Sequence, residues 1–246
     1  MNLSDGRLIH TPVIHSKLNQ FFTQIIIPLP DTIAKYADYV IGKTNHEPEM
    51  FKYIVWFLTN HYERSPYLGM DAVFVHLVEN YYTNGQAYWL TDEQQKKIIK
   101  KAATLKPLLL GKVTPDILAY DTKGDPIALS SVKSDFLVLY FWDSDCSHCK
   151  KVTPALHALY LKYKDKGLDV FALNTEQTED TWLNYVSKNN LSWINVNDKD
   201  NKSGFREKYD LYATPLIILL DKDKKIIAKK ISPEQLEELL KREMGL

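Results

Sequence analysis

One uninterrupted apolar run constrains the fold of this chain more than any other sequence feature. Residues 136–142 read Phe-Leu-Val-Leu-Tyr-Phe-Trp, without a charged side chain. Such a run is typical of a β-strand that is buried on both faces, as in sheets that helices cover on both sides. A segment with helical periodicity follows at residues 147–163. We therefore predict an α/β domain built around this strand.

Strands and helices alternate through the rest of this half of the chain. Further strands are predicted at residues 116–120, 126–129, 168–173, 193–196, 215–220 and 225–231. Further helices are predicted at residues 180–188 and 205–209, and from an N-terminal cap at Ser232 onward. The first two strands of this set and the last two each flank a turn that favours a hairpin. The alternation predicts an α/β unit.

The first half of the chain has helical periodicity instead. Helices are predicted at residues 31–40, 51–62 and 70–81, and from a capping box at Thr91-Asp92-Glu93-Gln94. The face of the first helix that we expect to be buried carries Ile33, Tyr36, Ala37 and Val40. A length of 246 residues suits two modest domains. We assign an all-α domain of unknown function to residues 1–106 and an α/β domain to residues 107–246.

Aromatic side chains are frequent in the helical half. They include Trp56, Phe57, Tyr62, Tyr67, Tyr81, Tyr82 and Tyr88. Their spacing predicts that most of them pack in the core between helices. The alternative is a groove for a partner.

The charge balance excludes some partners. Lys plus Arg and Asp plus Glu each number 31, so no net charge attracts nucleic acid or an anionic membrane. No stretch approaches the roughly 18 apolar residues that span a bilayer. The first seven residues are polar and lack the apolar region of a signal peptide. From the residues alone, the protein is either cytosolic or a processed form of an exported chain.

The chain has two cysteines, Cys146 and Cys149, between the buried strand and the following helix. A disulfide across so short a loop adds little stability, so the pair indicates redox chemistry. At a helix N-terminus, free N–H groups and the helix dipole favour a thiolate at Cys146. Cys146 is then the attacking thiol, and Cys149 resolves the mixed disulfide.

Two other interpretations of the cysteine pair stay open. A structural zinc ion usually takes four protein ligands, and no second Cys or His pair stands at a matching spacing. A redox-silent remnant of an ancestral site is the other alternative. We expect no metal and no cofactor beyond the Cys146–Cys149 disulfide itself.

Residues 141–151, with Pro154 beyond them, resemble the active-site segment of the thioredoxin superfamily. The residues Ala213-Thr214-Pro215 before a strand resemble the cis-proline loop of that family. The resemblance covers residues 108–246. It implies a thioredoxin-like fold, with a central mixed sheet flanked by helices, and thiol–disulfide oxidoreductase activity. It also implies a cis Thr214–Pro215 bond, with both residues holding the substrate backbone.

Within the superfamily, the chain is similar to extracytoplasmic proteins of Bacteroidetes-type bacteria that are related to reductases of cytochrome c maturation. Residues 69–77, upstream of residues 110–116, resemble the helical N-terminal region of that group. This resemblance implies a periplasmic location, or a membrane anchor preceding this chain. It also implies protein thiols or disulfides as substrates, and a thiol electron donor or acceptor.

Three positions depart from better-known relatives. Tyr140 stands where thioredoxin has a buried Asp, and Val152 stands where the cytochrome-maturation reductases have an acidic residue. His148 replaces the proline between the cysteines. The sequence therefore does not identify a proton acceptor for Cys149.

The residues expected to tune the redox couple are Trp142, Asp145, Ser147 and His148. His148 favours the thiolate and a potential near about −120 mV, whereas thioredoxin lies near about −270 mV. Asp143 and Asp145 oppose the thiolate, so the direction of the reaction stays open. Two other functions are a thioredoxin-fold binding module and, less well supported, a thiol peroxidase. The peroxidase pattern has Thr where this chain has Asp143.

Overall fold

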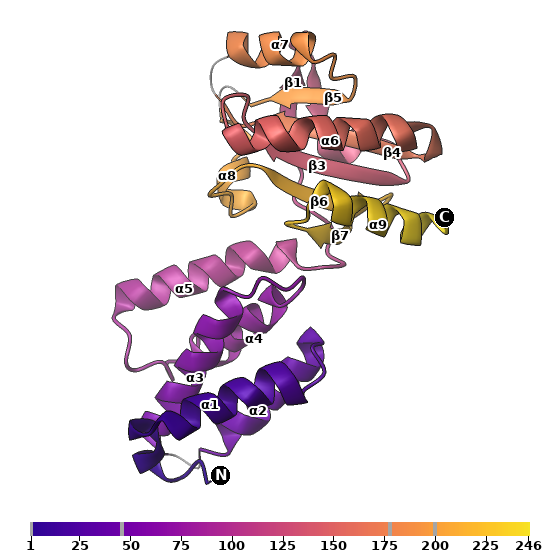
Figure 1. The fold of residues 1–246 in the computed structure, drawn as a ribbon. Coiled ribbons are helices and arrows are strands. Elements are labelled where there is room, and N and C mark those ends of the chain that lie inside the picture. The colour runs from indigo at the N-terminus through magenta and orange to yellow at the C-terminus, as the bar shows by residue number, and fades with distance from the viewer. Residues whose placement is uncertain (1, 45–46, 177–178, 199–200) are drawn as a thin grey trace. The chain divides into compact units, whose positions relative to one another are not determined.

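The computed structural model describes residues 2–44, 47–176, 179–198 and 201–246. The chain folds into two compact units, residues 1–109 and 110–246. The first is helical and the second is built on a sheet (Figure 1). The domain boundary predicted between residues 106 and 107 falls within a short 3-10 helix, Lys106–Leu108.

The helical unit consists of five main helices in its described residues. These are α1 (Pro12–Gln20), α2 (Pro30–Gly42), α3 (Pro48–Glu63), α4 (Asp71–Tyr81) and α5 (Asp92–Leu105). A proline opens each of the first three, where the missing N–H costs no hydrogen bond. The predicted capping box at Thr91 and Gln94 opens α5. Helix α1 was not predicted, because only Ile14 and Leu18 of its nine residues are buried.

Some of the predicted core positions of this unit are wrong. Tyr36 was expected on the buried face of α2 but is 41% exposed. The buried face turns instead through Ile33, Ala37, Val40 and Ile41, and Tyr36 lies at its margin. Its ring is held there edge-on by Phe21, with the ring centroids 5.9 Å apart.

The predicted aromatic core is correct only in part. Three of its rings are buried, namely Phe57, Tyr62 and Tyr82. Three other rings are at least half exposed, namely Trp56, Tyr67 and Tyr88. The spacing of these aromatic residues places all of them near the core, but it does not distinguish buried rings from rings that lie exposed at the edge of the core.

The second unit is built on a mixed sheet, as predicted. Its strands are β1 (Leu118–Asp121), β2 (Pro126–Ala128), β3 (Phe136–Trp142), β4 (Leu168–Asn174), β5 (Ile194–Asn197), β6 (Leu216–Asp221) and β7 (Ile226–Lys229). Among the described residues their order is β2-β1-β5-β4-β3-β6-β7. Strands β3, β4 and β5 run parallel, and β6 is antiparallel to β3. Both predicted hairpins, β1–β2 and β6–β7, are present.

Both edges of this sheet are short. Strand β2 has three residues and begins with Pro126. Strand β7 has four, and the segment before β1 lies along part of it: Gly111 N–H donates to Ile226 O, and Ile226 N–H donates to Lys112 O. A bridge between Val113 and Lys225 continues this contact.

The helices of this unit are α6 (Ser147–Tyr163), α7 (Glu179–Lys188), α8 (Phe205–Lys208) and α9 (Pro233–Met244). Helices α6 and α9 lie side by side on one face of the sheet, where Lys162 and Tyr163 both contact Glu237 (Figure 1). Helix α8 packs at β3 through Phe205, whose ring stacks on Phe141.

Strand β3 is apolar throughout because both of its faces are covered. Val138, Tyr140 and Trp142 pack in the core that includes Leu156 of α6. Phe141 points to the opposite face, against Phe205 and Tyr209. The strand ends at Trp142, so the chain enters its turn at the carboxyl edge of the parallel strands, where α/β sheets carry their functional sites. None of the described helices is long and apolar enough to cross a membrane.

The cap of α9 provides a test of this local structure. The Ser232 hydroxyl accepts a hydrogen bond from Gln235 N–H, and the Gln235 side-chain oxygen accepts one from Ser232 N–H. We expect Ser232→Ala to lower the free energy of unfolding by about 1 kcal/mol, because a helix N–H loses its partner. Urea denaturation of the full chain measures this.

The matched control for this test is Ser187→Ala. Ser187 is exposed on α7 and caps no helix. Its replacement should change the free energy of unfolding by only a few tenths of a kcal/mol. Equal stability of Ser232→Ala and the wild type would contradict the assigned role of the cap.

Candidate active site

Cys146 and Cys149 lie at the start of α6, as predicted, and both are free thiols. Cys146 is the N-cap residue and is partly exposed, whereas Cys149 is fully buried in the first turn. The turn from β3 is fixed by Asp143. Its carboxylate accepts from Asp145 N–H at 2.7 Å, and its carbonyl accepts from Cys146 N–H at 3.3 Å. This turn presents one sulfur outward and keeps the other inside.

The pKa of the Cys146 thiol lies below its ordinary value. Burial raises this pKa, but hydrogen bonds to the sulfur outweigh burial. The donors are the N–H and thiol of Cys149, the Thr214 side chain and the backbone of His148. The two backbone donors are free N–H groups of the helix N-terminus, so the thiolate form is stabilised where the sequence predicted it.

The second thiol has the opposite tendency. Burial raises the pKa of Cys149 to about 11, although a hydrogen bond from the Asp143 backbone and one from Thr214 lower it. The negative charge and hydrogen bond of Cys146 raise it further. The pKa values of the two thiols are thus shifted in opposite directions, and Cys149 stays protonated at neutral pH.

The loop before β6 lies beside this pair. The Thr214–Pro215 peptide bond is cis, the isomer that the resemblance implies. The Cys146 thiol donates to the carbonyl oxygen of Thr214 at 3.5 Å, so this loop borders the reactive sulfur. Tyr212, on the same loop, is 85% exposed.

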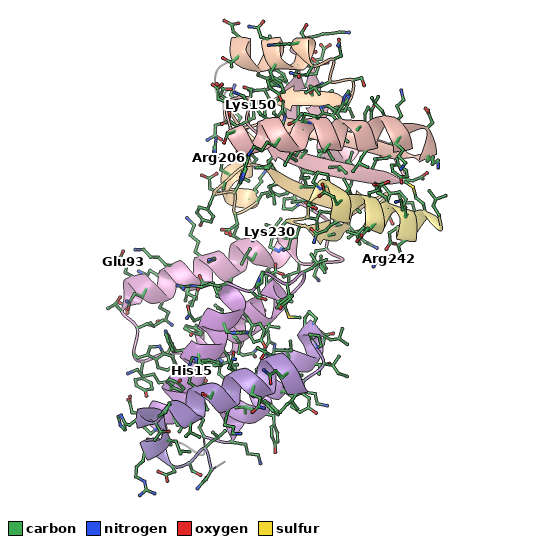
Figure 2. The ribbon with its side chains drawn as sticks, viewed as in Figure 1. His15, Glu93, Lys150, Arg206, Lys230 and Arg242 are labelled. Carbon is green, nitrogen blue, oxygen red and sulfur yellow. The ribbon has the colours of Figure 1, made fainter. Side chains whose placement is uncertain are left out.

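The four residues expected to tune the couple lie in different surroundings. Ser147 and His148 are exposed, and His148 acts on Cys146 through its backbone. Asp145 is exposed and pairs with Lys150 at 3.7 Å, which offsets its negative charge (Figure 2 labels Lys150). The Trp142 ring is buried behind the site and lies parallel to Tyr140, with centroids 6.2 Å apart.

Tyr140 and Thr153 form a buried pair of hydroxyl groups, and Tyr140 lies in the same core as Cys149. The Tyr140 hydroxyl is buried and lies 2.9 Å from the Thr153 hydroxyl. Burial raises the pKa of Tyr140 far above its ordinary range, while Thr153 lowers it slightly. The group is therefore neutral at physiological pH. Val152 supplies no charge either, so neither position offers a carboxylate to accept the proton of Cys149.

Sequence analysis missed a buried polar cluster beside the active-site turn. The Ser144 hydroxyl donates to the Glu176 carboxylate, just after β4. Asn197, at the end of β5, donates to the Asn174 side chain at 3.1 Å and to the Glu176 carbonyl at 2.8 Å. The available signal was Asn174-Thr175-Glu176 directly after a buried strand, because such residues meet at the carboxyl edge of a parallel sheet. The cluster ties the turn to β4 and β5.

Comparisons with known proteins agree with this geometry. Residues 134–226 match the family model described as thioredoxin-like. The chain is 32% identical to the thiol-disulfide oxidoreductase ResA of Bacillus cereus over 137 residues, which are 56% of this chain and 78% of that protein. It is 26% identical to ResA of Bacillus subtilis over 117 residues, covering 48% and 64% of the two chains.

Two solved structures extend the comparison. A domain of a possible thiol-disulfide isomerase from Cytophaga hutchinsonii is 41% identical, with a TM-score of 0.54, and covers 56% of this chain and 95% of that one. A thioredoxin-like protein from Bacteroides caccae covers 98% of this chain and 87% of its own, with a TM-score of 0.75 and 20% identity. At that identity the likeness concerns the fold, and it includes the helical unit.

The chain thus belongs to the thioredoxin-like family of proteins. Within that family it is an enzyme of the thiol–disulfide oxidoreductase class, like the relatives that share about a third of its residues over the second unit.

The difference between the two thiols can be measured by alkylation. In the reduced protein, we expect iodoacetamide to modify Cys146 with a midpoint below that of an unperturbed thiol, because hydrogen bonds lower the pKa of Cys146. Cys149 should stay unmodified through neutral pH, because it is buried and its pKa is about 11. Peptide mass spectrometry across a pH series distinguishes the two. Equal rates at both cysteines, or faster modification of Cys149, would contradict the assignment.

Proposed function

We propose that this enzyme exchanges disulfides with protein substrates through the Cys146–Cys149 couple. The observation that carries the proposal is the asymmetry of the pair: an accessible sulfur with a lowered pKa lies one helical turn from a buried sulfur with a raised pKa. A nucleophile must be reachable and ionised, and a resolving thiol need only reach its neighbour.

The exchange begins when the Cys146 thiolate attacks one sulfur of a substrate disulfide. A bond forms between Cys146 and that sulfur, and the other substrate sulfur leaves as a thiolate. Cys149 then loses its proton and attacks Cys146, which forms the Cys146–Cys149 disulfide and releases the second substrate sulfur. The substrate gains two electrons from the enzyme, one proton from Cys149 and one from solvent, because Cys146 enters the reaction already ionised. A thiol electron donor then reduces the Cys146–Cys149 disulfide and regenerates the enzyme. The same steps in reverse oxidise a substrate dithiol to a disulfide.

The raised pKa of Cys149 falls during this cycle for a physical reason. The Cys146 charge and hydrogen bond are among the causes that raise it, and the mixed disulfide removes the charge. Because Tyr140 is a neutral hydroxyl, we propose that the departing substrate thiolate or solvent accepts the proton. This replaces the buried acid of better-known relatives.

We assign substrate binding to Thr214 and Pro215. Their loop borders the attacking sulfur, and the Thr214 carbonyl lies 3.5 Å from it. An extended substrate segment on this loop would bring its disulfide to Cys146. We further propose that the enzyme works outside the cytoplasm, which fractionation of cells carrying its gene would test.

Trapping of the mixed disulfide tests the roles of the two cysteines. Cys149→Ser should retain substrate proteins in reducible complexes with Cys146, because the resolving attack is lost. Cys146→Ser should retain none, and the wild type few. Non-reducing electrophoresis before and after dithiothreitol measures this.

Two outcomes would count against the proposal. If Cys149→Ser traps nothing and the wild type reduces no test disulfide, the couple is redox-silent. If instead a variant without either cysteine still binds the same proteins, the second unit acts as a binding module.

We propose that Trp142, Asp145, Ser147 and His148 set the potential of the couple. Asp145→Asn removes a negative charge beside Cys146 and so favours its thiolate. The couple should then become more oxidising, by on the order of 10 mV for one exposed charge. Equilibration in a glutathione series, with thiol alkylation as the readout, measures the shift and the absolute potential.

Asp165→Asn is the matched control for this measurement. Asp165 is equally exposed but lies beyond the far end of α6, so its loss should leave the potential unchanged. A shift of Asp145→Asn toward more reducing potentials would contradict the electrostatic role assigned to Asp145.

A further inference from the structure

The helical unit contains a cavity of about 870 Å³ that has no part in thiol chemistry. Its walls come from the chain around Phe22 to Pro28, from α2, from the end of α3 and from the loop that follows α3. The volume lies within the roughly 300–1,000 Å³ of pockets that bind small organic molecules. All of its lining residues belong to this unit.

Most of the cavity wall is apolar. Phe22, Ile33 and Met70 line it and are each less than 5% exposed. Two further lining residues, Tyr67 and Leu68, are 74% and 43% exposed. Exposed apolar side chains that cluster around a cavity often indicate a binding site, whereas apolar side chains scattered singly over a surface do not.

The chain beside this wall adds further exposed apolar groups. Ile25, Ile27 and Leu29 flank the lining residue Pro28, and each is more than half exposed. The apolar surface thus extends beyond the cavity itself.

The polar lining groups come mainly from one short stretch, Asn60, His61, Arg64 and Ser65. Burial lowers the pKa of His61, so its ring is neutral at pH 7. Arg64 is exposed, and among the described residues it forms no ion pair. Among the described residues that line the cavity there is no Asp or Glu. The C-terminus of α3 lies nearby, and its helix dipole is equivalent to about half a negative charge. The full positive charge of Arg64 exceeds it, so the net charge at this end of the cavity is positive.

One buried polar atom of the wall has no partner. Tyr62 lines the cavity and is 3% exposed, and its hydroxyl makes no hydrogen bond among the described residues. Buried hydroxyl groups are normally paired, so an unpaired one needs an explanation. This hydroxyl is enclosed by protein, so it offers no contact to a molecule in the cavity.

From this cavity we infer a binding site for a long-chain carboxylate, an unbranched apolar chain with one anionic end. The apolar wall takes the chain, and Arg64 pairs with the carboxylate. A peptide segment fits less well, because its backbone N–H and C=O groups would lie against apolar walls without partners. An alkyl chain carries no such groups. The inference does not depend on the proposed redox reaction.

A displacement assay on the full chain tests the inference. The probe is dansylaminoundecanoic acid, whose fluorescence rises in an apolar site. We expect the probe to bind saturably. Dodecanoate should displace it at concentrations at least tenfold lower than dodecanol or dodecylamine requires. Arg64→Gln should weaken dodecanoate binding at least tenfold and leave dodecanol binding unchanged. Leu68→Glu, which places a negative charge at the wall, should weaken dodecanoate in the same way.

The matched controls make the same two types of substitution, Arg to Gln and Leu to Glu, at exposed positions of the second unit. Arg242→Gln on α9 and Leu161→Glu on α6 should bind dodecanoate like the wild type. Circular dichroism checks that each variant is folded. Three results would overturn the inference: no probe binding, equal affinity for dodecanoate and dodecanol with no effect of Arg64→Gln, or displacement by apolar peptides but not by dodecanoate.

Discussion

The structure of the second unit depends on the burial of β3. This strand pairs with β4 on one side and β6 on the other, and its side chains fill both layers of core. Because every position is apolar, the strand has one stable place, at the centre of the sheet. Its end then fixes where the chain turns into α6. The two sulfurs are thus positioned by core packing several residues earlier, together with the Asp143 turn and the Thr214 contact.

The chemistry of the site follows from where the chain leaves that core. The helix N-terminus supplies donors to Cys146, and the buried first turn withholds solvent from Cys149. The two effects separate the pKa values of thiols that are three residues apart. Asp145, which would oppose this separation, is partly neutralised by Lys150. The absence of an acid at Tyr140 and Val152 leaves the separation to helix geometry and burial.

Much of this arrangement could be predicted from the sequence. The apolar run gave β3 its bounds, and helical periodicity gave those of α6, because long uniform patterns leave little choice of register. Helix α1 was missed because two buried side chains make a weak pattern. Tyr36 was predicted to be buried but is exposed, because helical periodicity indicates which side of a helix is apolar and not how far burial extends around it. The contact of Ser144 with Glu176 joins residues 32 positions apart, which no local pattern encodes.

The edges of the sheet have a consequence for behaviour in concentrated solution. An open strand edge offers unpaired N–H and C=O groups to another chain, which is a common start of aggregation. Here β2 is only three residues long and begins with a proline that cannot donate. At the other edge, residues 111–113 already bond to β7 and its preceding turn. Neither described edge therefore leaves a long template on which the strand of a neighbouring molecule could pair.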